Sequence, residues 1–313
     1  MNSDRMPLSR RALLAGGALL MARPAAAKPK LKVAIFSKHL QFLSGEDLAR
    51  AIAQMGFDGV DLTVRKGGHV EPARVAQDLP PLVAISKQHG LEVPMVTTDI
   101  ADAETPYTED ILKTMAGLGI RNYRFGAFKW FRDQSYAAQL DAMKPRLAKL
   151  AALNARYQTC AMYHTHSGAG LVGASIWDLY LLMKDLDPKT MGINYDVGHA
   201  TIEGGLGGWI ASYKISGAHV RGIAVKDFLW EKDAKGNWRE EWKPIGEGMV
   251  RFPQFFAMVA ESGFAGPLQL HYEYPLGGAN NGTRQITIPR EEVFAAMKKD
   301  LVTVRGFLAQ AAL

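Results

Sequence analysis

The sequence predicts an α/β fold, a closed (β/α)8 TIM barrel, from two observations. Short apolar or β-branched runs alternate along the chain with amphipathic stretches of helical period, which is the pattern of repeated βα units. Six of the eight histidines lie where such a run ends and polar residues begin: His39, His69, His164, His166, His199 and His271. A parallel barrel gathers the carboxyl ends of its strands on one face, so these distant residues can share one site.

The expected elements follow in order. Strands are expected at residues 33–37, 60–64, 93–98, 123–125, 159–164, 193–196, 220–225 and 268–271. Helices are expected at 45–55, in a region after residue 64 that is interrupted at Pro80-Pro81 and ends near Gly90, and at 107–118, 136–157, 176–184, 208–214, 253–261 and 290–311. Eight strands paired with eight helices favour a closed barrel over an open sheet.

Residues 1–27 are expected to be an export signal and not part of the fold. Residues 1–11 are polar and basic with paired arginines, 12–22 are apolar, and 25–27 are the small residues of a cleavage site. This order is typical of a twin-arginine signal cut near Ala27. It predicts that the mature protein lies in the bacterial periplasm or outside the cell. The apolar stretch is shorter than the roughly 20 residues that span a bilayer.

The remainder, residues 28–313, is expected to be one barrel domain, because no linker rich in Pro, Gly or Ser divides it. The signal carries four arginines against one aspartate, so the formal net charge falls from +6 to +3 when it is removed. A mild charge without a long Lys/Arg block argues against nucleic acid as a partner, and no membrane anchoring is expected after cleavage. The single Cys160 lies in an apolar run and is expected to be a buried, inert thiol.

Alternation along the second strand decides which of its side chains point inward. The even-numbered positions of 60–64 carry Val or Leu and face the helices, which leaves Asp61, Thr63 and Arg65 facing the lumen. By the same rule, His164 and His166 share one face of the fifth strand. The carboxyl end of the barrel is therefore expected to be a polar mouth above an apolar interior.

The fifth strand carries the strongest motif, Tyr-His-Thr-His. Two imidazoles two residues apart on a strand, His164 and His166, can reach one ion or one substrate. The alternative is a pair of hydrogen-bonded structural histidines. After the sixth strand, Asp196 and His199 flank a glycine turn, where an Asx turn or a helix cap is the competing interpretation.

The last two strands add further ionisable groups. His271 and Glu273 share a face, and burying both is costly unless they are paired or bound to a metal. Lys226 follows the seventh strand, where it could stabilise an enolate or oxyanion, although a plain salt bridge with a neighbour is an equal alternative.

A further set of polar residues lies on or just after the first two expected strands, and these are interpreted as substrate-binding groups: Lys38, His39, Asp61, Arg65 and His69. Three tryptophans in the loops expected after strands four and seven could stack on a sugar face or simply pack those loops: Trp130, Trp230 and Trp238.

These motifs resemble those of the xylose-isomerase-like (β/α)8 superfamily of sugar isomerases and epimerases, which also contains sugar dehydratases and an abasic-site endonuclease. The resemblance covers nearly all of residues 28–313, through GFDGVDLTV, YHTH, NYDVGHA, VKD, IGEG and GPLQLHYEY. It implies that Asp196 binds a divalent metal and that His199 contacts the substrate.

The sequence departs from that family's pattern at three places. His164 replaces a metal-binding glutamate expected at the end of strand five, Ala224 replaces a histidine, and His271 occupies the first carboxylate position of strand eight. The expected metal ligands are therefore His164, Asp196 and His271, with Glu273 as a fourth ligand or as a base. Such a set suits Mn²⁺, Zn²⁺, Mg²⁺ or Co²⁺.

The expected function is that of a metal-dependent sugar isomerase or epimerase, which transfers a proton next to a carbonyl of a non-phosphorylated sugar or keto-sugar. Glu273 and Lys226 are the expected catalytic residues, and His166 and His199 are expected to contact the substrate. One alternative is a lyase or dehydratase that acts on a 3-keto-sugar or glycoside in the same site. Another is a periplasmic sugar-binding protein without catalysis.

Overall fold

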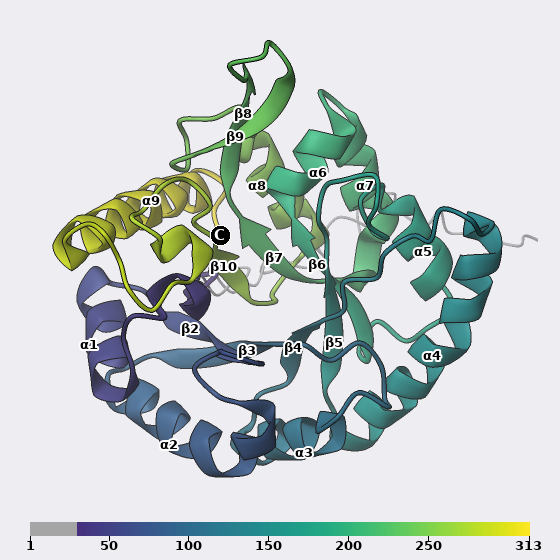
Figure 1. Ribbon diagram of the computed structural model, residues 1–313, viewed down its shortest axis with the longest axis horizontal. Coiled ribbons are helices and arrows are strands. Elements are labelled where there is room, and N and C mark those ends of the chain that lie inside the picture. The colour runs from purple at the N-terminus through teal and green to yellow at the C-terminus, as the bar shows by residue number, and fades with distance from the viewer. Residues whose placement is uncertain (1–29) are drawn as a thin grey trace, which may run out of the picture.

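The computed structural model describes residues 30–313, so the expected export signal lies outside the described residues. Eight parallel strands close into a barrel in the order β1-β10-β7-β6-β5-β4-β3-β2, with the helices around them (Figure 1). The barrel strands are β1 Val33–Phe36, β2 Gly59–Val64, β3 Glu92–Thr98, β4 Asn122–Phe125, β5 Cys160–His164, β6 Met191–Asp196, β7 Val220–Val225 and β10 Leu268–Leu270. The (β/α)8 barrel expected from the sequence is confirmed.

Closure depends on β1, which pairs with strands from both ends of the sheet. Ile35 lies opposite Leu270 of β10 on one side and opposite Val60 of β2 on the other, both in parallel register. No strand of the barrel is left with a free edge, and the carboxyl ends of all eight strands face one way.

The helices pack their apolar faces on the outside of the barrel. They are α1 Gly45–Met55, α2 Val75–Gln88, α3 Thr108–Leu118, α4 Tyr136–Tyr157, α5 Trp177–Met183, α6 Val197–Gly204, α7 Gly208–Ser216, α8 Phe252–Ser262 and α9 Arg290–Gln310. In α1, the side chains of Leu48, Ile52 and Met55 are buried at helical spacing. That helix ends at Gly56, whose φ of 93° is a left-handed conformation that favours glycine.

A second, smaller apolar cluster fills the interior of the barrel and is separate from the main core. Met95, Cys160 and Met162 form a small apolar cluster of their own. Met162 lies two residues before His164 on β5, so both point to the same side of the strand, into the lumen. Burial raises the pKa of the Cys160 thiol to about 11, as suits an inert buried cysteine.

The structure corrects the expected break in the second helix. α2 runs without interruption through Pro80 and Pro81. The two prolines remove backbone N–H donors, but Leu79, Leu82 and Val83 are buried on the same helix. Each buried aliphatic side chain contributes on the order of 2 kcal/mol, which offsets the cost of the prolines.

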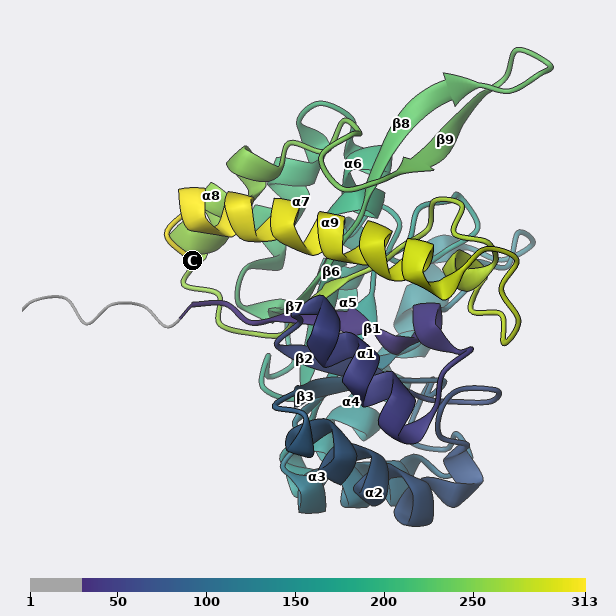
Figure 2. The ribbon, with the colours of Figure 1, turned by 90° about the vertical axis from the view of Figure 1, so that its left-hand side faces the viewer.

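The loop expected after strand seven is in fact a two-stranded hairpin. β8 Asp227–Lys232 pairs antiparallel with β9 Trp238–Lys243, so Trp230 and Trp238 lie on strands and not in a loop. Figure 2 shows this hairpin projecting beyond the helices. Most of β9 is exposed or half-buried, and it lacks the apolar alternation by which a strand is recognised.

Two smaller differences concern helices and length. α6, which starts directly at the end of β6, was not expected. The last barrel strand, β10, ends at Leu270, one residue before His271. Within residues 30–313, no helix is long and apolar enough to cross a membrane.

Candidate active site

A cavity of about 320 Å³ opens at the carboxyl ends of the strands and collects most of the expected site residues. Eight of them line it: Lys38, Arg65, His164, His166, His199, Lys226, His271 and Glu273. Asp196, which lies beneath this lining, is fully buried. The parallel barrel therefore brings together side chains that lie more than 200 residues apart in the sequence, because they follow the carboxyl ends of its strands.

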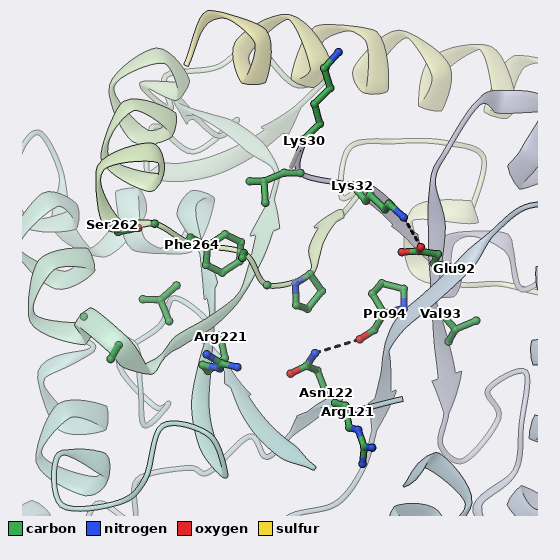
Figure 3. Close-up of a pocket in the computed structure, with 18 of the residues that line it drawn as sticks. Lys30, Lys32, Glu92, Val93, Pro94, Arg121, Asn122, Arg221, Ser262 and Phe264 are labelled. Atoms are coloured by element: carbon green, nitrogen blue, oxygen red, sulfur yellow. Dashed lines mark hydrogen bonds and ion pairs between the residues drawn. The ribbon is translucent and has the colours of Figure 1, made fainter. Parts of the chain in front are cut away.

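A larger hollow of about 910 Å³ lies at the opposite, amino-terminal end of the barrel (Figure 3). Its one carboxylate, Glu92, is paired with Lys32, and Asn122 donates a hydrogen bond to the carbonyl of Pro94. Its lining contains no histidine. Because acid-base and metal chemistry need unpaired carboxylates or imidazoles, the active site belongs at the other end.

Three residues at the floor of the smaller cavity form a candidate metal centre. One ligand atom from each of His164, Asp196 and His271 lies within 4.8 Å of the other two. These residues come from the ends of β5, β6 and β10, and all three are buried. No other group of three or more such residues was found in the described part of the chain.

The unsatisfied atoms of this cluster fit a bound cation. Asp196 Oδ2 and His271 Nε2 are buried and make no hydrogen bond, and His164 Nε2 lies 3.5 Å from the same Oδ2. A buried polar atom without a hydrogen bond is costly, and a metal ion would supply a partner to His271 Nε2 and a second one, beside the Lys226 ammonium, to Asp196 Oδ2. Burial lowers the pKa of His164 and of His271, which keeps both imidazoles neutral with a lone pair to offer.

Asn194, on β6, positions one of these ligands. Its amide nitrogen lies 2.9 Å from Nδ1 of His164, while its Oδ1 is buried without a hydrogen bond. The two amide atoms are interchangeable in assignment. With Oδ1 turned to His164, it accepts the Nδ1 proton and leaves Nε2 free for a metal.

Asp196 serves as a helix cap and as a candidate ligand at the same time. Its Oδ1 accepts the backbone N–H of His199 at 3.0 Å, which caps α6, and Oδ2 is left facing the cavity. The helix-cap interpretation of the Asp-Val-Gly-His segment is confirmed, and the metal-ligand role of Asp196 stays a prediction. Gly198 is required here, since a Cβ at that position would lie 2.8 Å from Cγ of Lys226.

Lys226 joins the carboxylate of Asp196 to His199, the histidine of that segment. Its Nζ lies 3.2 Å from Asp196 Oδ2 and 2.7 Å from His199 Nε2, and the side chain is buried. Burial raises the pKa of Asp196, and the ammonium of Lys226 opposes that rise. The ring of Trp242 covers the ammonium, with its centroid 4.5 Å from Nζ.

His166 lies next to His199, with ring centroids 5.2 Å apart, and is held by two further neighbours. Arg124 Nη2 donates to its Nε2 at 3.3 Å, and its Nδ1 donates to the carbonyl of His164 at 3.1 Å. Burial lowers the pKa of His166 to about 3, so the ring is neutral at physiological pH.

Glu273 reaches the cavity from the segment after β10. Its Oε2 lies 3.5 Å from Nζ of Lys38, and both side chains are partly exposed. Because this partly exposed carboxylate lines the same cavity as His164 and His271, it can contact a bound molecule, and its role as a general base stays a prediction.

Three residues expected to bind substrate lie outside the cavity lining. His39 is buried, accepts the N–H of Tyr272 at Nε2 and donates from Nδ1 to the carbonyl of Ala279. Asp61 accepts the hydroxyl of Thr97, and burial raises its pKa to about 7. His69 lies with Nδ1 3.0 Å from Thr63 Oγ1, in the loop after β2. A substrate contact for these three stays a prediction.

Three lining residues were not expected from the sequence: Phe36, Arg124 and Trp242. Arg124 occupies an inward position of β4, so strand alternation could have identified it. Phe36 stacks on His271 with ring centroids 4.7 Å apart. Trp242 is brought over the cavity by the hairpin, while Trp130 instead stacks on Tyr136.

Comparison with known proteins identifies the family. Residues 49–293 match the family described as xylose isomerase-like TIM barrel. The chain belongs to this family. No curated protein sequence matches the chain significantly.

Solved structures of this fold resemble the protein along almost its whole length. D-psicose 3-epimerase with D-tagatose, from Clostridium cellulolyticum H10, superposes with a TM-score of 0.64 at 12% identity over 89% of this chain and 99% of that one. A probable 3-DHS dehydratase from Bacillus anthracis has a TM-score of 0.64 at 16% identity, covering 87% of this chain and 99% of its own. A xylose isomerase-like TIM barrel protein from Mycobacterium smegmatis in complex with magnesium has a TM-score of 0.61 at 15% identity, covering 87% and 98%.

Proposed function

We propose that the protein is a metal-dependent sugar isomerase or epimerase that transfers a proton next to a carbonyl of a non-phosphorylated sugar or keto-sugar. The supporting observation is the buried cluster of His164, Asp196 and His271 at the floor of a cavity that Glu273 and Lys226 also line. Solved neighbours that include an epimerase bound to D-tagatose are in keeping with a sugar substrate.

Each side chain has a defined part in this proposal. Glu273 removes the proton from the carbon next to the carbonyl; its return by the same carboxylate to the neighbouring carbon gives isomerisation, whereas epimerisation requires a second proton donor on the other face of the substrate. Lys226 donates hydrogen bonds to the oxygen that becomes negative as the proton leaves. A divalent ion held by the three buried ligands would polarise that carbonyl. His199 and His166, whose ring centroids lie 5.2 Å apart at the cavity wall, are placed to bind sugar hydroxyls.

Two alternatives use the same cavity. If the substrate carries a leaving group on the β-carbon, the same proton removal gives elimination, and a probable dehydratase is among the structural neighbours. If no proton is removed, the protein is a sugar-binding protein on an enzyme scaffold. The lack of a glycine-rich phosphate loop in the sequence favours unphosphorylated ligands for each alternative.

Solvent exchange separates these possibilities. Purified protein is incubated in D₂O with candidate ketoses and 3-keto-glycosides, and deuterium next to the carbonyl is measured by NMR. Wild-type protein should introduce deuterium into at least one of them, and Glu273→Gln should not. Elimination would instead release an unsaturated product. If bound metal is present and no compound exchanges or eliminates, the enzymatic proposal is wrong and binding alone remains.

We also propose that residues 1–27 direct export by the twin-arginine route. The support is the paired Arg10 and Arg11 ahead of an apolar stretch and small residues. In cell fractionation, the wild-type chain should be found in the periplasm or medium. The double variant Arg10→Lys, Arg11→Lys should stay in the cytoplasm, and equal distribution of both proteins would contradict export by this route.

A further inference from the structure

The cavity wall carries more positive charge than its own carboxylates balance. Four of the side chains that line it are cations: Lys38, Arg65, Arg124 and Lys226. Lys38 is paired with Glu273, and Lys226 with Asp196. Two guanidinium groups are left over.

Neither of these guanidiniums has a carboxylate partner within the described residues. Among residues 30–313, neither Arg65 nor Arg124 forms an ion pair at 4.0 Å or less. Arg124 donates to Nε2 of His166, while within residues 30–313 the guanidinium of Arg65 makes no hydrogen bond and only its backbone carbonyl accepts one, from Gly68. Asp61 faces the same lumen, but it accepts the hydroxyl of Thr97 and forms an ion pair with neither arginine.

Both arginines lie against the ring of Phe36. Their Cζ atoms are 5.6 Å (Arg65) and 5.9 Å (Arg124) from the centroid of Phe36. Burial, with the charge of Arg65 next, lowers the pKa of Arg124 to about 10, and the more distant charges of Asp61, Asp196 and Glu273 oppose this lowering. No carboxylate within residues 30–313 contacts either guanidinium directly, so an anion placed at both would supply the partner that they lack and would reduce their mutual repulsion.

We infer that Arg65 and Arg124 bind a carboxylate of the substrate, so that the site acts on sugar acids. This inference rests on the proposed function and names its substrate class. A guanidinium presents two parallel N–H donors that match the two oxygens of a carboxylate. Phe36 packs between the arginines and His271, so a carboxylate here lies one aromatic ring away from the metal cluster.

The dimensions of the cavity agree with a small acid. Its volume of about 320 Å³ suits one sugar ring or open-chain sugar and excludes an oligosaccharide held wholly inside. That is the lower end of the roughly 300–1,000 Å³ usual for small-molecule sites. With the carbonyl at the metal cluster and the acid group at the arginines, both ends of such a molecule are fixed.

The test compares the dissociation constants of matched acids and neutral sugars, measured by titration calorimetry. Hexuronates, aldonates and keto-aldonates are each compared with the neutral sugar of the same configuration, on wild-type protein and on Arg65→Met and Arg124→Met. At least one acid should bind wild-type protein ten times more tightly than its neutral partner or better. That preference should fall at least tenfold in each variant and should recover in part in Arg65→Lys, which keeps the charge.

Arg74→Met is the matched control, because Arg74 lies on the outer surface and is paired with Asp78. It should keep the full preference for the acid. Circular dichroism and the midpoint of thermal unfolding show whether each variant is folded, and Arg65→Lys supplies the comparison if a Met variant is not.

Three results would overturn the inference: no acid bound more tightly than its neutral partner, a preference that survives in both folded Met variants, or a sugar phosphate bound more tightly than the matched acid. Failure here is distinct from failure of the proposed function. If neutral keto-sugars exchange deuterium and no acid is preferred, only the carboxylate-binding inference is wrong. If an acid is preferred and no compound exchanges, only the isomerase proposal is wrong.

Discussion

Nζ of Lys226 lies 2.7 Å from Nε2 of His199, and an ammonium can only donate in such a contact. His199 therefore accepts at Nε2 and carries its proton on Nδ1, which lies 2.8 Å from Ser167 Oγ and donates to it. Burial, with the charge of Lys226 next, lowers the pKa of this imidazole and keeps it neutral. The contact with His199 therefore holds the Lys226 ammonium beside Asp196, in the candidate metal centre.

Lys226→Met should reduce kcat by about 10² to 10³, the usual loss when one donor to a developing oxyanion is removed. The metal content should stay the same, because Lys226 is not a ligand. Steady-state kinetics and metal analysis on the same sample measure the two quantities. Lys144→Met, on the exposed face of α4, is the control and should leave kcat as it is. A Lys226→Met protein with wild-type turnover would exclude a role for this lysine in the reaction.

Trp242 should affect substrate binding more than turnover. Its ring lies over Lys226 and 5.3 Å from the ring of His199, at the edge of the cavity. Stacking of a sugar on such a ring contributes about 1 kcal/mol, so Trp242→Ala should raise KM by up to about tenfold. Trp238 is on the same strand but 64% exposed and outside the cavity, and Trp238→Ala should leave KM unchanged. Equal effects of the two substitutions would contradict stacking at Trp242.

Asp227 should be a stability residue, although it follows Lys226 directly. Its carboxylate accepts four backbone N–H groups, those of Phe228, Gly246, Gly248 and Val250, at 2.8 to 3.1 Å. Gly248 permits this, since a Cβ there would lie 2.1 Å from Oδ1. Asp227→Ala leaves these donors unsatisfied and should lower the free energy of unfolding by about 3 kcal/mol or more.

Urea unfolding measures that loss, and Asp233→Ala is its control. Asp233 also accepts backbone N–H groups, from Lys235 and Asn237, but in the exposed turn of the hairpin. Water replaces those bonds, so the control should lose less than about 1 kcal/mol. If Asp227→Ala is as stable as Asp233→Ala, the IGEG segment is not held in the way the structure indicates.

The barrel itself could be predicted because its strands are buried and alternate, and the strand ends therefore identified His164, Asp196 and His271. The segments after the strands could not be predicted by the same rule. β1 ends at Phe36 and a 3-10 turn, Ser37–Leu40, comes next, which changes the side-chain period from two to three. His39 is consequently turned into the wall, while its neighbour Lys38 reaches the cavity.

The hairpin was missed for a different reason. Its strands project from the barrel and bury little, so hydrophobic periodicity carries no signal there, and Trp242 could not be placed. Contacts between side chains from different strands, such as the stacking of Phe36 on His271, depend on closure of the barrel and cannot be predicted from the local sequence.

His69 should make the protein less stable in mild acid. Burial lowers its pKa to about 4, against about 6.5 in the unfolded chain. Between these values the unfolded state binds the proton and the folded state does not, so this contribution is complete above pH 6.5 and is lost as the pH falls from 6.5 towards 4. Glutamine cannot titrate. The free energy of unfolding of His69→Gln should therefore fall less steeply over this range than that of the wild type, by at most about 1.4 kcal/mol per pH unit. Parallel curves would show that His69 is not buried in its neutral form.

The metal content of the purified mature protein tests the central claim most directly. Wild-type protein should contain about one divalent ion per chain, since one ligand atom from each of His164, Asp196 and His271 lies within 4.8 Å of the other two and they form a single site. His164→Ala, Asp196→Ala and His271→Ala should each lose most of it, while His219→Ala, outside the cavity, should keep it. A folded wild-type protein that takes up no stoichiometric ion, or that holds as much metal after His271→Ala, would contradict a metal centre here.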